Sequence, residues 1–312
     1  MRNSSTAPVP PVPTGVKLGV YVIDELIGRD GRGQVYRARD TQANRLVALK
    51  IVSPTLAVKG ARFARFQREA RTGALLNHPN IATVLDLGCD DGVPFVVSEL
   101  LRGTTLRRLI ERAPLGVGLA VDYARQVSRG LAAAHQVGVP HRDLRPENIF
   151  VTAEGCVKIL DFGLAKNQLE ALELLQADDS SPSEVAAVLR RISYLSPEQV
   201  RGEEAGDHSD LFSLGVILYE MLSGALPFTG HSTIDTLNSI LSDEPRPLDL
   251  GDGDVGRELN RVVRRCLEKD PADRFQSAGD LLVNLELAVA AAARGVPPVP
   301  PVASTNRLLH LS

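Results

Sequence analysis

The segment HRDLRPENIF, residues 141–150, lies between two apolar stretches and carries Asp143 and Asn148 five positions apart. A carboxylate can orient and deprotonate a hydroxyl group, and an amide oxygen can bind a divalent cation. Eighteen residues after Asp143, the segment VKILDFG (157–163) presents Asp161 at the end of a strand pattern, where its carboxylate can meet a cation. A lone aspartate is usually a turn or cap residue. That interpretation does not explain Asp143, Asn148 and Asp161 in this order. Together they indicate a site that activates a hydroxyl group and binds a cation.

A glycine-rich segment, IGRDGRGQV, occurs upstream at residues 27–35. Three glycines fall within six positions: Gly28, Gly31 and Gly33. This spacing is typical of a loop folded over a phosphate chain. Asp30 departs from the pattern, because phosphate oxygens repel a carboxylate and its Cβ restricts close approach of the backbone. An arginine lies close to the acid on each side. We therefore expect weakened, not lost, phosphate binding.

Lys50 ends the apolar strand pattern LVALK, in a chain with six lysines and 29 arginines. An ammonium group near the interior of a domain needs a partner. Glu69 lies in a helix that we expect at about residues 60–76, and it is the candidate. From these two residues alone, an ion pair and two unrelated surface charges are both open interpretations.

The composition excludes several classes of protein. The chain has 312 residues, is 44% hydrophobic and 23% charged, and carries a net charge of −3 without a basic run. We therefore predict a soluble globular protein that does not bind nucleic acid. The three cysteines lie far apart, as expected of free thiols in a reducing compartment. The sequence shows neither a signal-peptide core nor ~18 uninterrupted apolar residues, so we expect a cytoplasmic chain without a membrane span.

Proline-rich segments flank the chain, with PVPPV at 8–12 and again at 298–302. Proline at this density favours an extended polyproline II backbone without a core. We therefore predict disordered flanks over residues 1–17 and 294–312. The favoured interpretation is a pair of semi-rigid flanks; the alternative is a ligand for an SH3-like or WW-like groove.

The region between the flanks changes character along its length. Segments such as YVIDELIG, QVYRARD, LVALKIV, IATVLDLG and PFVVSELL predict strands, whereas the pattern from residue 104 is mainly helical. LAVDYARQVSRGLAAAHQVG predicts an amphipathic helix that Gly138 can cap, and DLFSLGVILYEMLSG (210–224) predicts a helix buried on all sides. The fold class is therefore α+β, with a small β-rich lobe at 18–101 and a larger helical lobe at 102–293.

Taken in order, these segments resemble a protein kinase. The motifs IGRDGRGQV, VALK, HRDLRPEN, DFG, SPE (196–198), SDLFSLG and DPADRF are similar to the signature set of bacterial, eukaryotic-like Ser/Thr protein kinases, over about residues 18–290. The resemblance implies a two-lobed kinase fold. It also implies transfer of the γ-phosphate of ATP to Ser or Thr hydroxyls of protein substrates, with Mg²⁺, or Mn²⁺ as an alternative, as the metal.

The resemblance also implies roles for individual residues. Asp143 would be the catalytic base, Lys50 held by Glu69 would bind the α- and β-phosphates, and Arg145 would face the γ-phosphate. Asn148 and Asp161 would hold the metal. Glu198 and Arg274 would form a buried ion pair, and Asp210 would anchor the catalytic loop. Further ATP contacts would come from Ile27, Gly28, Gly31, Gly33, Val35, Ala48, Phe150 and the backbone of Glu99 and Leu101.

Regulation is implied by the segment between DFG and SPE. Arg142 resembles the arginine that receives a phosphorylated activation loop, and Ser180, Ser181 and Ser183 are candidate phosphorylation sites. NQLEALELLQ within it has leucines at helical spacing and favours a short helix. A disordered serine-rich loop is the competing interpretation. Input would come from an upstream sensor or through the Pro-rich flanks.

Three further positions depart from the family. Arg190 and Arg191 stand where relatives usually have Gly-Thr; an arginine there can donate to Asp143 but would crowd the substrate hydroxyl, or it can recognise an acidic substrate. Gly73, four residues after Glu69, leaves a gap beside its helix. These departures keep a second function open, a pseudokinase that binds nucleotide or partners as a signalling module. The intact catalytic residues favour the active enzyme, and a small-molecule phosphotransferase is disfavoured.

Overall fold

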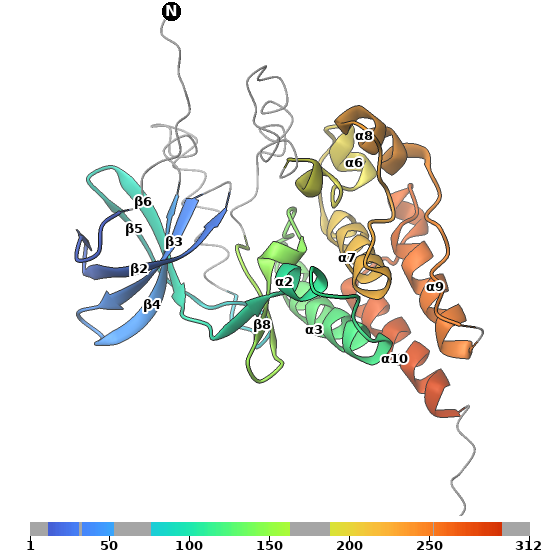
Figure 1. The fold of residues 1–312 in the computed structure, drawn as a ribbon, viewed down its shortest axis with the longest axis horizontal. Helices are drawn as coiled ribbons and strands as arrows, with labels where there is room; N and C mark the ends of the chain where they lie inside the picture. Colours follow the sequence, from blue (N-terminus) through green and yellow to red (C-terminus); the bar gives the residue numbers. More distant parts are fainter. Residues whose placement is uncertain (1–11, 31–32, 53–75, 163–187, 252, 295–312) are drawn as a thin grey trace, which may run out of the picture.

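The computed structural model describes residues 12–30, 33–52, 76–162, 188–251 and 253–294. It has a lobe of strands and a lobe of helices, with a small sheet between them (Figure 1). The predicted α+β, two-lobed class is confirmed. The exact boundary between residues 101 and 102 stays a prediction.

The N-lobe is a six-stranded antiparallel sheet of order β1-β2-β3-β4-β6-β5. Side chains alternate between the two faces of a strand. One face of β3 and β4 buries Tyr36, Ala38, Val47 and Leu49 in the core of the lobe. The opposite face therefore carries Lys50. The strand bounds are Lys17–Leu18 (β1), Tyr21–Asp30 (β2), Gly33–Asp40 (β3), Arg45–Val52 (β4), Val84–Asp90 (β5) and Val93–Glu99 (β6).

The chain reaches the N-lobe earlier than expected. The Val12 amide donates to the Tyr36 hydroxyl at 2.7 Å, and the Gly15 amide donates to the Ile23 carbonyl at 2.8 Å. Lys17 and Leu18 then form β1 against β2. Residues 12–17, which we assigned to the disordered flank, thus lie on the sheet; residues 1–11 are outside the described part.

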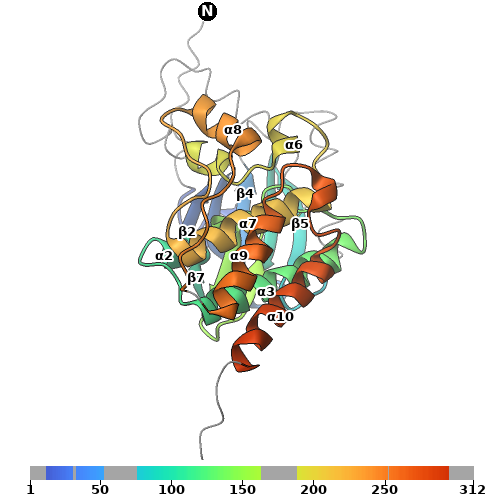
Figure 2. The same cartoon turned by 90° about the vertical axis from the view of Figure 1, so that its right-hand side faces the viewer.

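The second lobe begins with the small sheet β7-β8-β9 and continues as helices. Figure 2 shows α9 and α10 covering α3 and α7 on the outer side of this lobe. None of the helices in the described ranges is long and apolar enough to cross a membrane. The bounds are Gly103–Thr105 (β7), Leu106–Ile110 (α2), Val117–His135 (α3), Pro146–Asn148 (η1), Ile149–Thr152 (β8), Val157–Ile159 (β9), Pro197–Val200 (α6), Asp207–Ser223 (α7), Thr233–Ser242 (α8), Asp254–Cys266 (α9), Pro271–Asp273 (η3) and Ala278–Arg294 (α10).

Helix α7 is the centre of the lobe. Its residues from Ser209 to Leu222 are all buried, as the sequence predicts for a helix that is apolar on every side. A Cβ atom at Gly215 would lie 2.5 Å from the Cβ of Cys266, so the glycine permits the close approach of α9. Gly224 ends the helix with φ of 73°, the left-handed conformation that glycine adopts without strain.

Helix α3 packs beside α7 through the predicted face. All six positions expected on that face are buried: Ala120, Tyr123, Ala124, Val127, Leu131 and Ala134. The helix ends at His135, slightly before the expected cap. Gly138 follows in a left-handed conformation with φ of 72°, and its amide donates to the His135 carbonyl at 2.9 Å.

A buried ion pair joins α6 to the segment before α10. The two terminal nitrogens of Arg274 each donate to one oxygen of Glu198 at 2.8 Å, and the Arg274 side chain is 0% exposed. The remaining Arg274 donors reach backbone carbonyls, and the Ser209 hydroxyl donates to Glu198 at 2.6 Å. Burial alone would raise the pKa of Glu198, but Arg274 and Ser209 outweigh it and lower that pKa to about 2.

Loss of this pair is expected to destabilise the lobe. Arg274→Met leaves a buried carboxylate without its partner, which costs about 3–5 kcal/mol of the free energy of unfolding. Chemical denaturation followed by circular dichroism measures the loss. Arg257→Met is the matched control, because Arg257 pairs with Asp254 at a side-chain exposure of 66%, and we expect it to cost less than about 1 kcal/mol. Equal stabilities of the two variants would contradict the prediction.

The same pair predicts how stability depends on pH. The folded-state pKa of Glu198 lies below its ordinary value of 4.5, so its stabilising effect is present above that value and is lost as the pH falls through about 2. The shift corresponds to about 3 kcal/mol. Glu198→Gln cannot titrate, so its free energy of unfolding should fall less steeply than that of the unmodified protein between pH 5 and pH 2. Parallel curves would refute this assignment.

Candidate active site

The carboxylate of Asp210 fixes the loop between α3 and η1. It accepts the amides of His141 and Arg142, each at 2.7 Å, and lies 2.8 Å from Nε2 of His135. Arg142 has φ of 66°, a conformation that is costly for a residue with a side chain. Gln199 donates to the Arg142 carbonyl at 2.9 Å, so this turn is held from both sides. The anchoring contact expected of Asp210 is present.

The same loop is tied to the strand end that carries Asp161. Nε2 of His141 donates to the Leu160 carbonyl at 2.8 Å, and the Leu160 amide donates to the Asn148 carbonyl at 2.8 Å. Because His141 donates through Nε2, its Nδ1 can accept from the Asp143 amide, at 3.3 Å. The ring of His141 also packs edge-on against Phe162. Residues 141–150 and the end of the strand that carries Asp161 therefore lie together.

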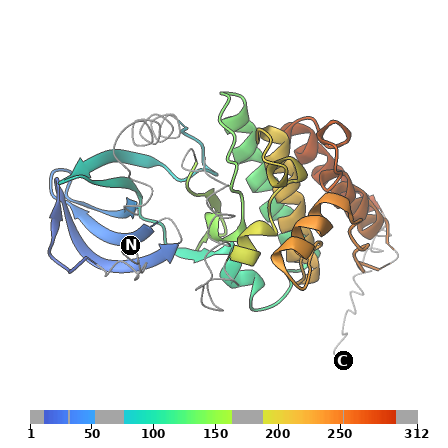
Figure 3. The ribbon, with the colours of Figure 1, turned by 90° about the horizontal axis from the view of Figure 1, so that it is seen from above.

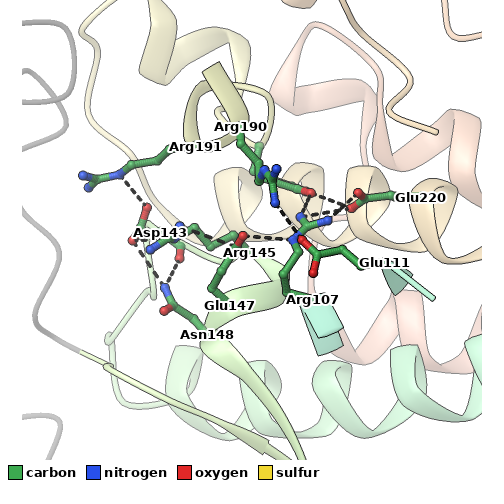
Figure 4. Close-up of polar contacts among 10 residues, drawn as sticks. Arg107, Glu111, Asp143, Arg145, Glu147, Asn148, Arg190, Arg191 and Glu220 are labelled. Atoms are coloured by element: carbon green, nitrogen blue, oxygen red, sulfur yellow. Dashed lines mark hydrogen bonds and ion pairs between the residues drawn. The ribbon is translucent and has the colours of Figure 1, made fainter. Parts of the chain in front are cut away.

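Asp143 is the centre of one of the two groups of polar contacts in Figure 4, and Arg107 is the centre of the other. Its side chain is 3% exposed. Nδ2 of Asn148 donates to the Asp143 carbonyl at 2.8 Å and to Oδ2 at 3.3 Å. Nε of Arg191 donates to Oδ1 at 3.3 Å, and Nε of Arg145 lies 3.6 Å from Oδ2. Two guanidinium groups therefore face the two oxygens of one buried carboxylate.

Lys50 connects the two lobes, which lie side by side in Figure 3. Its Nζ donates to Oδ2 of Asp161 at 2.6 Å. Asp161 has φ of 62°, so its backbone, like that of Arg142, is in the left-handed region. A second bridge joins Lys158 and Glu99 at 2.8 Å. Burial would raise the pKa of Glu99, but Lys158 and the Thr83 amide lower it.

The strand register places several predicted ATP contacts on one face. Val35 lies opposite Lys50 across β3 and β4, and Ala48 is two residues from Lys50, so these three side chains share a face. Phe150 lies on the face of β8 opposite the buried Ile149 and Val151.

The other predicted ATP contacts are less closely placed. Gly28 is paired with Val35, and Ile27 beside it is 44% exposed. The Glu99 amide donates to the Thr83 carbonyl at 3.0 Å. The backbone group of Glu99 that would contact adenine is therefore its carbonyl. Gly33 begins β3 and Leu101 follows β6. Outside the described residues lie Gly31, Glu69, Gly73, Ser180, Ser181, Ser183 and the segment NQLEALELLQ.

A buried group of polar side chains around Arg107 was not predicted from the sequence. Arg107 donates to Glu220 at 2.7 Å and to Glu147 at 2.9 Å, and it also contacts the Tyr194 hydroxyl. Burial alone would lower the pKa of Arg107, but its acidic neighbours raise it, and burial beside Glu220 raises that of Tyr194. Arg107 and Glu220 are 113 positions apart. The only local signal for Arg107 and Glu220 was that each is a charged residue within an apolar segment.

This arrangement of lobes and polar side chains is that of the protein kinase domain, whose family pattern matches residues 21–283. The chain belongs to this family, whose members use ATP and a divalent metal, generally Mg²⁺. It is 39% identical over 276 residues to Serine/threonine-protein kinase pkn3 of Myxococcus xanthus, covering 85% of this chain and 49% of that protein. It is 38% identical over 271 residues to Serine/threonine-protein kinase PknD of Mycobacterium tuberculosis, covering 86% and 40%.

Solved structures agree with this assignment. The PknI kinase domain of Mycobacterium tuberculosis superposes with a TM-score of 0.70 at 26% identity, over 89% of this chain and all of that domain. The relatives make this a kinase domain of the bacterial Ser/Thr type, as the resemblance implied. The chain spans less than half the length of the two curated relatives.

The Asp210 contact predicts a local change in one variant. In Asp210→Asn, an amide group replaces one accepting oxygen, so the His141 and Arg142 amides cannot both be accepted as they are now. A hydrogen bond to a charged group contributes about 1.5–3 kcal/mol, so we expect amide hydrogens of the loop to exchange at least about tenfold faster. Hydrogen–deuterium exchange by mass spectrometry measures this. Asp207→Asn, on the same helix with a side chain 43% exposed, is the control. Unchanged exchange in Asp210→Asn would refute the role.

Proposed function

We propose that this chain is an ATP-dependent serine/threonine protein kinase, which transfers the γ-phosphate of ATP to Ser or Thr hydroxyls of proteins. The observation that carries the proposal is the chain of contacts from one lobe to the other. Lys50 contacts Asp161 at 2.6 Å, the neighbouring Leu160 is bonded to Asn148, and Asn148 is bonded to Asp143. The names of the relatives support the same reaction.

The donor atoms fit a magnesium ion bound together with ATP. Mg²⁺ prefers one or two carboxylate or amide oxygens from the protein and completes its shell with water and phosphate oxygens. Asp161 and Asn148 supply such a pair. The bound ion would neutralise the charge of the phosphates.

The protein side chains have distinct tasks in this proposal. Lys50 moves from the Asp161 carboxylate toward the α- and β-phosphates, with Glu69 as its further partner. Asp143 orients the acceptor hydroxyl and takes its proton as the hydroxyl oxygen bonds to the γ-phosphorus, while the bond from that phosphorus to the β,γ-bridging oxygen breaks and ADP leaves. Arg145, 3.6 Å from Asp143, stabilises the γ-phosphoryl group during transfer.

The nucleotide would lie against the face that holds Val35 and Ala48, with Ile27 above it and Phe150 on the opposite side. Gly28, Gly31 and Gly33 would cover the phosphates, and the backbone of Glu99 and Leu101 would meet the adenine. Asp30 weakens this binding by charge repulsion without removing it. The acidic residue thus lowers affinity for ATP in a site that still holds it through Lys50 and the metal.

Control of the activity would act through the activation segment. Phosphate on Ser180, Ser181 or Ser183 would pair with Arg142, whose Nε now donates to the Ala205 carbonyl at 3.0 Å. The PVPPV segments suit an SH3-like partner or a link to an upstream sensor.

The relatives are named as Ser/Thr protein kinases and do not favour the pseudokinase alternative, which would depend on the contact between Arg191 and Asp143. A guanidinium at 3.3 Å from the base competes with the acceptor hydroxyl for the same oxygen. The two functions differ in one outcome: the enzyme turns over phosphate, whereas the pseudokinase binds nucleotide only.

Autophosphorylation separates these two functions. Purified protein with Mg·ATP should acquire phosphate on Ser180, Ser181 or Ser183, as mapped by mass spectrometry. Asp143→Asn should lower the rate by at least about 100-fold, because general base catalysis contributes about 10²–10⁴. Asp249→Asn, at an exposed position, is the control and should keep the rate. No phosphate in the unmodified protein, with ATP still bound in a thermal-shift assay, would establish the pseudokinase instead.

A further inference from the structure

The contact between Arg191 and the proposed base is long. Charge-assisted N–H···O hydrogen bonds are usually 2.7–2.9 Å, whereas the Arg191 and Arg145 contacts with Asp143 measure 3.3 and 3.6 Å. The Arg191 side chain is 21% exposed, so water and an incoming group can reach it. In Figure 4 its Nε faces Asp143 and its terminal nitrogens point away from the base. Those terminal atoms are the ones that bind a carboxylate in a forked geometry.

The acidic side chains beside Asp143 are, by contrast, firmly engaged. Arg107 holds Glu220 at 2.7 Å and Glu147 at 2.9 Å, with side chains of 10% exposure for Arg107 and 8% for Glu220. A basic residue of a substrate could reach Glu220 only by displacing the buried Arg107, which is strongly unfavourable. Glu220 therefore offers little to a basic substrate.

The second arginine is also exchangeable. Arg190 pairs with Glu111 at 2.8 Å, and their side chains are 47% and 50% exposed. Exposed pairs of this kind contribute little, so a stronger anionic partner can replace Glu111. Arg190 and Arg191 are consecutive in the helical turn at 188–192, and Figure 4 shows Arg190 directed toward Glu111 and Arg191 toward Asp143.

We propose that Arg191 makes the site selective for protein substrates that carry an acidic side chain within about two residues of the acceptor Ser or Thr. The carboxylate of the substrate binds the Arg191 guanidinium in place of Asp143. Oδ1 of Asp143 then becomes available to the acceptor hydroxyl. An extended peptide advances about 3.3 Å per residue, so only near neighbours of the acceptor can reach that guanidinium. Arg190, at the exposed surface beside Glu111, adds to the preference for acidic substrates. The inference rests on the proposed function for its catalytic consequence, but the recognition of acidic peptides is testable without turnover.

The experiment uses matched peptides that differ only in the residues flanking the acceptor: Glu, Gln or Lys. Versions with Ala at the acceptor report binding by fluorescence anisotropy, and versions with Ser report kcat and KM with Mg·ATP. The unmodified protein should favour the Glu peptides over the Lys peptides by about tenfold in affinity and in kcat/KM, equivalent to ~1.4 kcal/mol. Arg191→Gln should remove this preference and raise kcat on the Gln peptides, because the base is no longer contacted.

Two further variants separate charge from structure. Arg191→Lys keeps the charge without the fork, so it should retain part of the preference. Arg201→Gln removes an exposed arginine that follows α6 and should leave the preference unchanged. A melting temperature measured for each variant shows that it is folded.

The outcomes distinguish this inference from the proposed function. Phosphorylation without discrimination between Glu and Lys peptides, or with the same discrimination in Arg191→Gln, overturns the inference and leaves the kinase activity standing. Preferential binding of Glu peptides that depends on Arg191, without phosphorylation of any Ser peptide, upholds the recognition and overturns the proposed function.

Discussion

The active-site geometry depends on one buried carboxylate. Asp210 is 0% exposed in the first turn of α7, a helix that is otherwise buried by apolar contacts. Removal of a charge from water is costly unless hydrogen bonds replace the lost hydration. The amides of His141 and Arg142 do this, and the partial positive charge at the start of the helix adds to it. The hydrogen bonds to Asp210 thus hold Arg142 in its left-handed conformation. The conformation of Arg142 in turn orients the neighbouring Asp143.

Much of this could be predicted from the sequence, because the signals were local. Alternation along LVALK places Lys50 on the face away from the core, and the apolar surround of Asp210 indicates a buried helix. The order of the motifs identified the lobes and the residues that now lie together around Asp143. The attachment of residues 12–17 was missed because they lack a strand pattern, and they join the sheet through backbone hydrogen bonds that any sequence can make.

The partners of the arginines could not be predicted, because they depend on the tertiary fold. Arg190 and Arg191 are neighbours, yet a helical turn rotates consecutive side chains by about 100°. One therefore reaches Glu111 on the surface and the other reaches Asp143. The sequence indicated that an arginine here could donate to the base but not which one would. Arg107 contacts Glu220 only because α2 packs beside α7. The two residues are far apart in the sequence, so no local sequence pattern predicts the contact.

The contacts around Asp143 fall into two kinds, which differ in length. Three of the contacts that set the backbone are short: the His141 amide to Asp210 at 2.7 Å, Asn148 to the Asp143 carbonyl at 2.8 Å, and His141 to the Leu160 carbonyl at 2.8 Å. Contacts from Arg145 and Arg191 to the carboxylate are longer, at 3.6 and 3.3 Å. A rigid frame costs no reorganisation when the substrate arrives, whereas the long contacts can be exchanged for those of phosphate or substrate. Arg145 and Arg191 therefore contact the carboxylate of Asp143 without setting the backbone of its loop.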